Sequence, residues 1–372
     1  MTVFINSHTN RQNGNGVYLI ELIQNLKIYE SKIITLSSNI INKKLEIIKL
    51  GFILKKKNNT ATKIFEIFLL FFLILKNNQI LRNEKIILTS DPPMIGLLLV
   101  ILKKILNFKL YFWCQDIFPN TLLVSNVIKK NIFFMILTKL NKFILNNCDK
   151  IITISTDMKK TLLYEYQINI EKIKTVQNWP TIKNNFTKKI ISKKNYFNFF
   201  YIGNIGRMHD ESNAMKFLKK INNPNLNIKI FTQSQKILKY KKDSFFKNSI
   251  QNCFLTDKNF IDCLNISDIQ IIFQNTNSLK YIFPSKLYNI LLFQKPILYF
   301  LDEGEDEITN LIKKFKIGLR VSKNNFTKHI YLFKNDKFIL KIINESREGY
   351  RKLNYIRSIR QESMNEWRSI LA

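Results

Sequence analysis

The sequence predicts an α/β fold of two doubly wound domains, each built on a parallel sheet, and three observations support this prediction. Short apolar runs alternate with helical patterns through the first half of the chain. The same alternation returns in the second half, after a polar stretch rich in Lys and Asn. Strands that alternate with helices are typical of parallel sheets covered by helices on both faces. We therefore expect two similar domains facing a crevice, with ligands at the carboxyl ends of both sheets.

The first half opens with an apolar run, Val3–Asn6, that leads through a glycine loop into a helix. Gly14 and Gly16 mark the loop, and apolar residues at helical spacing follow from Val17 to Leu26. Four more apolar runs, each followed by a loop or a helical pattern, predict the remaining strands: Ile33–Leu36, Lys85–Thr89, Lys109–Cys114 and Lys150–Ile154.

The polar break between the halves begins at Asn178-Trp179-Pro180 and extends to Asn195. Further strands are predicted beyond it, beginning at Phe197 and continuing at Ile228–Phe231, Ile269–Phe273, Pro296–Phe300 and Gly318–Val321. We accordingly expect an N-terminal domain over residues 1–182, a C-terminal domain over 183–350 and a helical segment over 351–372.

Charge and composition narrow the choice of partners. The 372 residues suffice for two domains, and a hydrophobic content of 46% allows each to bury a core. The formal net charge of +32 favours polyanions, anionic nucleotides or an anionic membrane surface. Because the sequence has no zinc-finger spacing, RNA-binding aromatic motif or basic arm, we expect no nucleic acid partner. A membrane surface suits the charge better.

The cysteines and the N-terminus indicate a cytoplasmic location. The four cysteines form no Cys-x-x-Cys pair and have no histidine grouped with them, so they read as reduced and mostly buried thiols: Cys114, Cys148, Cys253 and Cys263. The N-terminus enters a short strand directly, without a basic region and a long apolar run, so we expect no secretion.

Three apolar stretches are too short or too interrupted to span a bilayer, which takes about 20 apolar residues: Ile64–Leu75, Met94–Leu106 and Ile132–Leu145. Two interpretations stay open for them. They are either core helices that flank the sheet or helices that lie in a membrane interface. Phe-rich faces bounded by lysines such as Lys63, Lys76 and Lys104 suit anionic lipid, because apolar burial and charge attraction add.

Two segments of the second half together resemble a pocket for a diphosphate. In Phe199–Asp210, an apolar strand runs into a turn in which Gly203 and Gly206 allow backbone N–H groups to approach an anion. Arg207 follows, and its guanidinium can bind phosphate oxygens bidentately. Taken alone, this segment is better explained as an ordinary strand-to-helix turn with a surface Arg.

The second segment, Phe283–Leu298, strengthens the diphosphate interpretation. Pro284 suits the start of a helix, Ser285 supplies a hydroxyl group and Lys286 supplies a positive charge.

These and other motifs, in their order along the chain, resemble the family 4 glycosyltransferases of the GT-B architecture, in particular the bacterial branch that builds O-antigen, capsule and colanic-acid-like polysaccharides. The resemblance covers nearly the whole chain. It rests on a glycine loop, a Thr-Ser-Asp-Pro-Pro turn, a segment ending in Asp-Ile-Phe-Pro, a strand ending in Ser, an Asn-Trp-Pro link, the two segments above and a closing strand–helix unit: Asn13–Val17, Thr89–Pro93, Trp113–Pro119, Cys148–Ser155, Lys174–Pro180, Tyr201–Asp210, Pro284–Leu298 and Glu303–Val321.

The resemblance implies two Rossmann-like domains and transfer of a sugar, with retention, from a nucleoside diphosphate donor of UDP or GDP type to an acceptor hydroxyl. Arg207 and Lys286 would then neutralise the leaving diphosphate. The resemblance also implies that the final helix, within 351–372, crosses back to the N-terminal domain. The remaining donor-binding residues that it implies are Gly203, Asn204, Gly206, His209, Pro284, Ser285, Leu287 and Asn289.

The N-terminal domain supplies the expected acceptor side. Asp116 is the candidate for a catalytic contact to the acceptor or donor sugar, and a turn or helix cap is its alternative. His209 either donates to a phosphate oxygen or is an exposed loop residue without a role. The other candidates for the acceptor or donor-sugar loop are His8, Gly14, Gly16 and Gln115.

The chain departs from the family pattern at several positions. Asn289 stands where many relatives carry a Glu that accepts hydrogen bonds from the ribose, and Gln115 stands where many carry His. The Lys usually found a few residues after the Arg is absent from its expected place. Because the sequence has no Asp-x-Asp motif, we expect no metal; the acidic run Asp302–Glu307 is better explained as carboxylates at a helix N-terminus.

Three functions stay open at this level. The first is a glycosyltransferase that acts on a lipid-linked saccharide at the inner face of the plasma membrane, as a peripheral protein. The second is a nucleotide-sugar epimerase or hydrolase of the same architecture, which would need more acid and base side chains than a chain with 3 histidines offers. The third is a membrane-bound relative without catalysis, which Asn289 and Gln115 would support.

Overall fold

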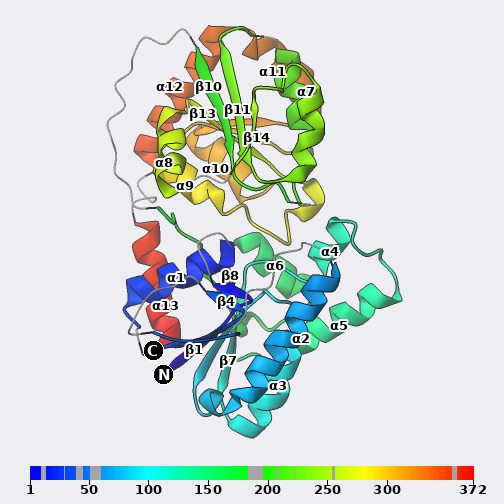
Figure 1. Cartoon of the computed structure of the whole chain (residues 1–372). Helices are drawn as coiled ribbons and strands as arrows, with labels where there is room; N and C mark the ends of the chain where they lie inside the picture. Colours follow the sequence, from blue (N-terminus) through cyan, green and yellow to red (C-terminus); the bar gives the residue numbers. More distant parts are fainter. Residues whose placement is uncertain are drawn as a thin grey trace. The chain divides into compact units, whose positions relative to one another are not determined.

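The computed structural model describes residues 1–9, 14–28, 30–38, 45–50, 60–182, 196–206, 208–221, 223–253, 256–353 and 358–372. It divides into two compact units (Figure 1). The first unit comprises Met1–Thr181, Lys280–Phe283 and Gln361–Ala372, and the second comprises Ile182–Leu279 and Pro284–Arg360. The predicted segment 351–372 spans an interruption, because helix α12 ends at Lys352 and helix α13 begins at Ile359.

The sheet of the first unit is parallel and doubly wound. Its strand order is β5-β3-β1-β6-β7-β8-β9 among the residues that the structure describes, so it grows in both directions from β1. Its strands are β1 (Thr2–Ile5), β3 (Lys32–Thr35), β5 (Glu46–Lys49), β6 (Lys85–Thr89), β7 (Lys109–Cys114), β8 (Lys150–Thr153) and β9 (Ile173–Thr175). A separate parallel pair is formed by β2 (His8–Thr9) and β4 (Ser37–Ser38). The strands of the main sheet are mostly continuous apolar runs because helices cover both faces.

The helices of the first unit lie on both faces of this sheet. They are α1 (Gly14–Leu26), α2 (Thr60–Lys76), α3 (Ile95–Leu106), α4 (Asn120–Val124), α5 (Ile132–Asn147), α6 (Thr156–Tyr164) and α13 (Ile359–Leu371), with short 3₁₀ turns η1 (Asn78–Leu81) and η2 (Ile170–Lys172). Figure 1 shows α2, α3 and α5 along one side of the sheet and α1 and α13 along the other. On the latter side Trp113 of β7 packs against Trp367 of α13, with ring centroids 4.7 Å apart.

The predicted glycine loop at Gly14 and Gly16 is wrong. Both residues lie in the first turn of α1, and Gly16 is buried there with Tyr18 and Leu19. Glycine tolerates loop and helical backbone conformations alike, so its presence permits a loop without requiring one. The apolar face of the helix extends back to Gly16 and therefore sets the helix start earlier than Val17.

The sheet of the second unit repeats the same plan. Its described strands are all parallel, in the order β12-β11-β10-β13-β14-β15, and the order reverses beside β10. They are β10 (Phe197–Ile202), β11 (Leu226–Thr232), β12 (Ile250–Asn252), β13 (Ile269–Phe273), β14 (Ile297–Phe300) and β15 (Gly318–Val321). The expected strands at Ile269–Phe273 and Gly318–Val321 match these bounds residue for residue.

The helices of the second unit mostly alternate with its strands along the chain. They are α7 (Ser212–Ile221), α8 (Asp257–Ile266), α9 (Lys286–Leu292), α10 (Glu307–Phe315), α11 (Phe326–Phe333) and α12 (Asp336–Lys352), with 3₁₀ turns η3 (Gln235–Lys242), η4 (Thr276–Ser278) and η5 (Lys323–Asn325). In α7 the buried residues recur at helical spacing, from Ala214 through Phe217 to Ile221. Phe217 packs edge-on against Phe300 of β14 and Phe333 of α11, which joins the two layers.

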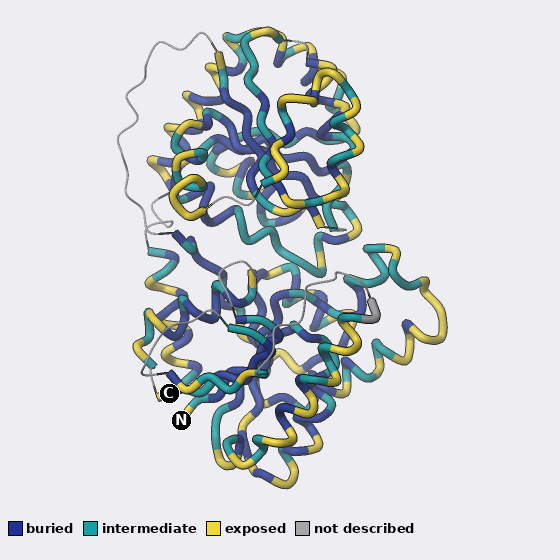
Figure 2. The backbone as a smooth tube through the Cα atoms, viewed as in Figure 1, coloured by how far each residue is buried: buried dark blue, intermediate teal, exposed yellow. Residues whose placement is uncertain are grey.

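The outer surface of α2, α3 and α5 is unusually apolar. Figure 2 shows exposed stretches along these helices. Their exposed apolar residues are Ile64, Phe65, Phe68, Phe71, Phe72 and Leu75 on α2, Ile101 and Ile105 on α3, and Ile132, Phe133, Met135, Ile136 and Phe143 on α5. We call this set the apolar face. Among the described helices, none has the length and apolar content to span a bilayer.

Candidate active site

Strand β10 ends in a turn whose first residue has a backbone conformation suited to glycine. Gly203 has a φ of 132°, a region that other residues rarely adopt. Its N–H donates to the carbonyl oxygen of Phe231 on β11 over 3.0 Å, so the turn starts as a continuation of the sheet. The turn thus lies at the carboxyl end of the strand beside which the sheet order reverses, where open α/β sheets bind ligands.

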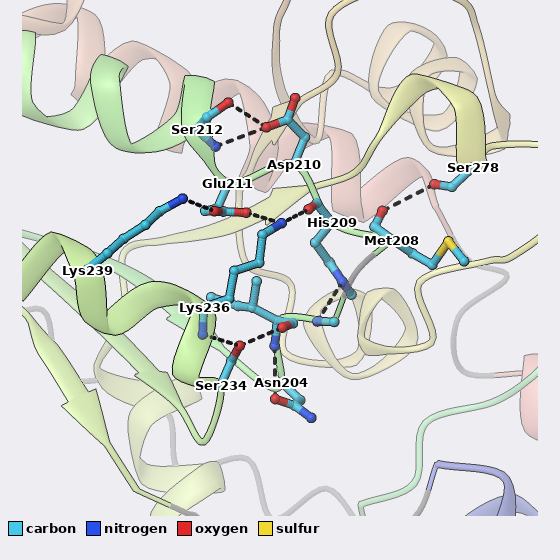
Figure 3. Close-up of polar contacts among 12 residues, drawn as sticks. Asn204, Met208, His209, Asp210, Glu211, Ser212, Ser234, Lys236, Lys239 and Ser278 are labelled. Atoms are coloured by element: carbon cyan, nitrogen blue, oxygen red, sulfur yellow. Dashed lines mark hydrogen bonds and ion pairs between the residues drawn. The ribbon is translucent and has the colours of Figure 1, made fainter. Parts of the chain in front are cut away.

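The side chains of Asn204 and His209 fold back onto this turn (Figure 3). The Oδ1 of Asn204 accepts from the N–H of Ile205 over 3.1 Å, and the Nδ1 of His209 accepts from the N–H of Gly206 over 3.1 Å. The sequence predicts that the N–H groups of Gly203 and Gly206 face an anion, and each of them already has an acceptor in this structure. An anion at the turn would have to exchange with these acceptors.

The amine of Lys286 lies over two aromatic rings beside the turn. Its Nζ is 3.7 Å from the ring centroid of Tyr201 and 5.9 Å from that of Phe273, and these two rings stack with centroids 4.4 Å apart. A Cβ atom added at Gly203 would lie 3.5 Å from the same Nζ, so the glycine leaves room beside the amine. The Nζ is buried and has no hydrogen-bond partner among the described residues.

Burial lowers the pKa of Lys286 to about 7. The face of Tyr201 stabilises the ammonium form through its quadrupole, but no carboxylate is paired with it among the described residues. An isolated buried charge is unfavourable, and a ligand that carries negative charge would remove the penalty. This position is therefore suited to an anion.

His209 is neutral in this environment. Burial lowers its pKa to about 3, and the positive charge of nearby Lys286 acts in the same direction. Because the Nδ1 accepts from the N–H of Gly206, the single ring proton is on the Nε2. The ring therefore offers one N–H donor and adds no charge.

The residues around Lys286 on α9 differ in their placement. Ser285 is the N-cap residue of α9, and its side chain makes no capping hydrogen bond; Pro284 precedes it. Leu287 is fully buried in the core, and Asn289 is buried and has a partner within the protein. Gly203, Asn204, Gly206, His209 and Lys286 thus come together, whereas Leu287 packs as a core residue. Arg207 lies outside the described residues.

A buried carboxylate that the sequence analysis overlooked lies next to this turn. Glu211, just before α7, forms ion pairs with Lys236 at 2.5 Å and with Lys239 at 3.2 Å (Figure 3). The only sequence signal is a Glu immediately before an amphipathic helix and two lysines three residues apart in the turn after β11. That spacing does not reveal a contact across about 25 positions of sequence.

In the first unit, polar side chains gather where β1 and β6 end. The hydroxyl group of Ser7 donates to Asp91 over 3.2 Å, and the hydroxyl group of Thr89 donates to the Oδ1 of Asn6 over 2.6 Å. Asn6, Ser7 and Thr89 are buried. A polar network of this kind at the carboxyl edge of a parallel sheet is where a ligand of that unit is expected.

Asp116 lies directly after β7, at the same edge. Ser90 accepts hydrogen bonds from the N–H groups of Gln115 and Asp116 at 3.2 and 3.3 Å. Burial raises the pKa of the Asp116 carboxyl to about 6, the charge of Asp91 adds to the rise, and a hydrogen bond with Ser90 opposes it. Asp116 caps none of the described helices; α4, the next one along the chain, begins at Asn120 with Pro119 as its N-cap residue. The backbone of Asp116 instead forms a β-bridge with Ile282 of the same unit.

The other predicted residues of the first unit already have protein partners. Gln115 and Asn178 exchange side-chain hydrogen bonds of 2.9 and 3.4 Å. The Nδ1 of His8 lies 2.8 Å from the hydroxyl group of Ser37, and its Nε2 lies 3.2 Å from Glu66. Gly14 and Gly16 lie in α1, as described above.

The acidic run before α10 lies at the N-terminus of that helix, which is the explanation preferred to a metal motif in the sequence analysis. Asp306 is the N-cap residue of α10 and accepts from the N–H of Thr309 over 2.8 Å. It also accepts from the hydroxyl group of Tyr299 over 2.7 Å. Glu305 pairs with Lys313, and Asp302 accepts from the side chain of Asn213 over 2.6 Å.

The sequence comparisons are limited in reach. No protein-family model matches the chain. The chain is 24% identical over 258 residues to a probable glycosyltransferase, WbjE, of Pseudomonas aeruginosa. The match covers 66% of this chain and 64% of that protein, so the chain aligns with somewhat less than two thirds of the length of its curated relative.

Solved structures align with this chain over nearly its whole length. WaaG, a glycosyltransferase involved in lipopolysaccharide biosynthesis, aligns over 98% of this chain and 99% of its own, with a TM-score of 0.68 and 8% identity. HepE of Anabaena, solved in complex with UDP, aligns over 99% of both chains with a TM-score of 0.65 and 11% identity. At such low identity the likeness concerns the fold. It confirms the predicted α/β class: the chain has the GT-B fold, with two Rossmann-like parallel-sheet domains.

Proposed function

We propose that the protein is a glycosyltransferase that moves a sugar from a nucleoside diphosphate donor of UDP or GDP type to an acceptor hydroxyl. One observation carries this proposal: the amine of Lys286 is buried beside the Gly203 turn, with no hydrogen-bond partner among the described residues. A diphosphate supplies the missing negative charge. The similarity to WbjE and the fold shared with WaaG and UDP-bound HepE support the same reaction class.

The proposed roles follow the chemistry of a leaving diphosphate. Lys286 and Arg207 neutralise the charge that develops on it, which is usually the largest contribution to catalysis of this kind. Ser285 and the Nε2–H of His209 donate to its oxygens, while the Nδ1 of His209 continues to accept from the N–H of Gly206. The donor domain is the C-terminal one, residues 183–350.

The N-terminal domain, residues 1–182, takes the acceptor. Asp116 contacts the acceptor or the donor sugar, and Gln115 and His8 belong to the same proposed acceptor or donor-sugar site. The polar network around Ser7 and Asp91 supports this role, because hydroxyl and carboxylate groups suit the hydroxyl-rich surface of a saccharide.

We further propose a retaining reaction of the family 4 type. The bond from the anomeric carbon to the diphosphate breaks, the bond to the acceptor oxygen forms on the same face of the sugar, and the acceptor proton leaves with the diphosphate. The acceptor is a lipid-linked saccharide in the biosynthesis of a cell-surface polysaccharide of the O-antigen or capsule type.

The apolar face supports a place on the inner surface of the plasma membrane. Phe68 and Phe72 on α2 are 68% and 64% exposed, and the exposed lysines Lys63, Lys76 and Lys104 border this face. A monomeric soluble domain rarely exposes so many large apolar side chains together. Phenylalanine that enters the interface and lysine that binds anionic headgroups add their contributions.

The proposal is tested by turnover with the purified full-length protein, a panel of UDP- and GDP-sugars and a lipid-linked saccharide extract. Lys286→Ala and Arg207→Ala should each reduce nucleoside diphosphate release by about 100-fold or more, as expected when a donor to developing charge is removed. Lys328→Ala, which removes an exposed charge on α11, is the matched control. Full activity in both variants would contradict the assignment. Absence of any nucleotide binding by the wild-type protein would favour the non-catalytic alternative.

A further inference from the structure

Two side chains that follow β11 bind backbone carbonyls of the Gly203 turn. The hydroxyl group of Ser234 donates to the carbonyl oxygen of Ile205 over 2.7 Å, and the Nζ of Lys236 donates to the carbonyl oxygen of His209 over 2.7 Å. Figure 3 shows both side chains reaching the turn from the same side. They thereby fix both ends of the stretch from residue 205 to residue 209.

The Nζ of Lys236 is itself held by a buried carboxylate. Glu211 is only 2% exposed and lies 2.5 Å from the Nζ of Lys236, which is 37% exposed. A buried carboxylate is stable only when it is paired, so this ion pair fixes the amine against the turn. Lys239 pairs with the other oxygen of Glu211 at 3.2 Å, and among the described residues it makes no hydrogen bond to the turn.

The ring of His209 folds back onto the same stretch of backbone. With both ends held, the N–H of His209 donates to the carbonyl oxygen of Gly206 over 3.2 Å, and the N–H of Gly206 donates to the ring Nδ1 over 3.1 Å. This reciprocal pair closes a small loop. It holds the ring in one orientation and one tautomer, with the proton on the Nε2.

We propose that Lys236 is a positioning residue for the donor diphosphate. It acts through the carbonyl of His209, with Ser234 as the second attachment point and Glu211 as its own anchor. The ligand in this proposal, a nucleoside diphosphate, is the one named in the proposed function above, so this part of the proposal rests on that function. The arrangement of the turn itself can be measured without any nucleotide.

The first test is nitrogen NMR of the histidine rings in the full-length protein. The chain has 3 histidines, so a spectrum of His209→Asn identifies the His209 signals by their loss. In the wild-type protein we expect one neutral tautomer with protonated Nε2. In Lys236→Met we expect exchange between both tautomers, whereas Lys239→Met, which also removes a partner of Glu211, should leave the spectrum unchanged. An unchanged spectrum in Lys236→Met, or equal changes in both variants, would overturn the proposal.

The second test is calorimetric titration with UDP and GDP. Lys236→Met should lower the affinity for the nucleotide that the wild-type protein binds by about tenfold or more. Lys236→Arg should restore most of that affinity. The affinity of Lys239→Met should stay within about twofold of the wild-type value. If Lys236→Met does not fold, Ser234→Ala removes the other attachment point without a change in charge and should give the same spectral change and weaker binding. Wild-type protein that binds neither nucleotide would refute the proposed function, while the histidine spectra would still decide the role of Lys236.

Discussion

At the residue scale, the site is defined by charges in unusual surroundings. The sequence indicates Ser285-Lys286 and the Gly203 turn because their residue types suit a diphosphate. The two segments also follow each other in the order of the family 4 glycosyltransferase motifs. It does not indicate that the amine lies over Tyr201 and Phe273, because those residues belong to β10 and β13 and meet only once the sheet has formed. Glu211 and Lys236 escape prediction for the same reason: their pairing depends on tertiary structure.

The lowered pKa of Lys286 predicts that diphosphate binding takes up a proton. With a pKa of about 7 in the free protein, the amine is mostly neutral at pH 8, and a bound dianion favours the ammonium form. At pH 8 we expect uptake of up to about 0.9 proton per nucleotide bound, and affinity that falls as pH rises above 7. Calorimetry in buffers with different ionisation enthalpies measures this uptake.

The matched variant for this prediction is Lys286→Arg, because arginine stays charged at pH 8. It should bind without proton uptake, although its different shape will change the affinity. Equal proton uptake by Lys286→Arg and the wild-type protein would assign the titration to another group.

The raised pKa of Asp116 predicts a residue whose ionised form destabilises the fold. The folded pKa of about 6 exceeds the ordinary value of about 3.9, so the folded state binds the proton more tightly than the unfolded state does. Stability is therefore lost as pH rises from about 4 through 6. Asp116→Asn should raise the free energy of unfolding by about 1–2 kcal/mol at pH 7.5, with little change at pH 4, while it lowers turnover.

Denaturation followed by tryptophan fluorescence checks this prediction, because all 3 tryptophans, Trp113, Trp179 and Trp367, lie in the first unit. Asp149→Asn is the control. Asp149 pairs with Lys103 and accepts from the N–H of Leu110, so its loss should destabilise the protein. A stability of Asp116→Asn equal to or below that of the wild-type protein at pH 7.5 would contradict the account.

At the element scale, the parallel strands are well predicted because strands buried on both faces leave unbroken apolar runs in the sequence. The runs at Lys85–Thr89 and Lys109–Cys114 match β6 and β7 residue for residue. Helix starts are less predictable. Gly14 and Gly16 suggest a loop by composition, yet the buried face of α1 includes Gly16. Whether an apolar helix faces a core or the solvent is also not encoded in its composition; α2 does both, with Leu70 buried and Phe68 exposed.

The apolar face predicts binding to anionic vesicles. We expect the protein to float with vesicles that contain phosphatidylglycerol and to bind vesicles of pure phosphatidylcholine less, because the lysines contribute only where the lipid is anionic. Phe68→Ser combined with Phe72→Ser should lower the bound fraction several-fold, since each phenylalanine contributes apolar area to the interface.

Tyr331 on α11 provides the comparison for this experiment. It is 69% exposed, as much as Phe68, and belongs to the second unit. Tyr331→Ser should bind vesicles like the wild-type protein. Two results would contradict binding through the apolar face: a loss of vesicle binding in Tyr331→Ser as large as in the double variant, or no loss of vesicle binding in either protein.

At the scale of the whole molecule, two sheets of the same design carry different chemistry at their carboxyl edges. The described site of the second unit gathers an amine, a neutral imidazole and aromatic rings, which suit an anionic group. That of the first unit gathers hydroxyl, amide and carboxyl groups, which suit a saccharide. The GT-B fold provides the two edges, and the residues on them, rather than the fold, support the proposed reaction.

The most direct measurement is calorimetric titration of UDP and GDP into the wild-type protein and into Lys286→Ala at pH 7. We expect the wild-type protein to bind at least one of the two nucleotides, and Lys286→Ala to lose about tenfold or more of that affinity while its histidine spectrum and unfolding transition stay close to wild type. Equal affinity in the two proteins would contradict the claim that the buried amine of Lys286 binds the donor diphosphate.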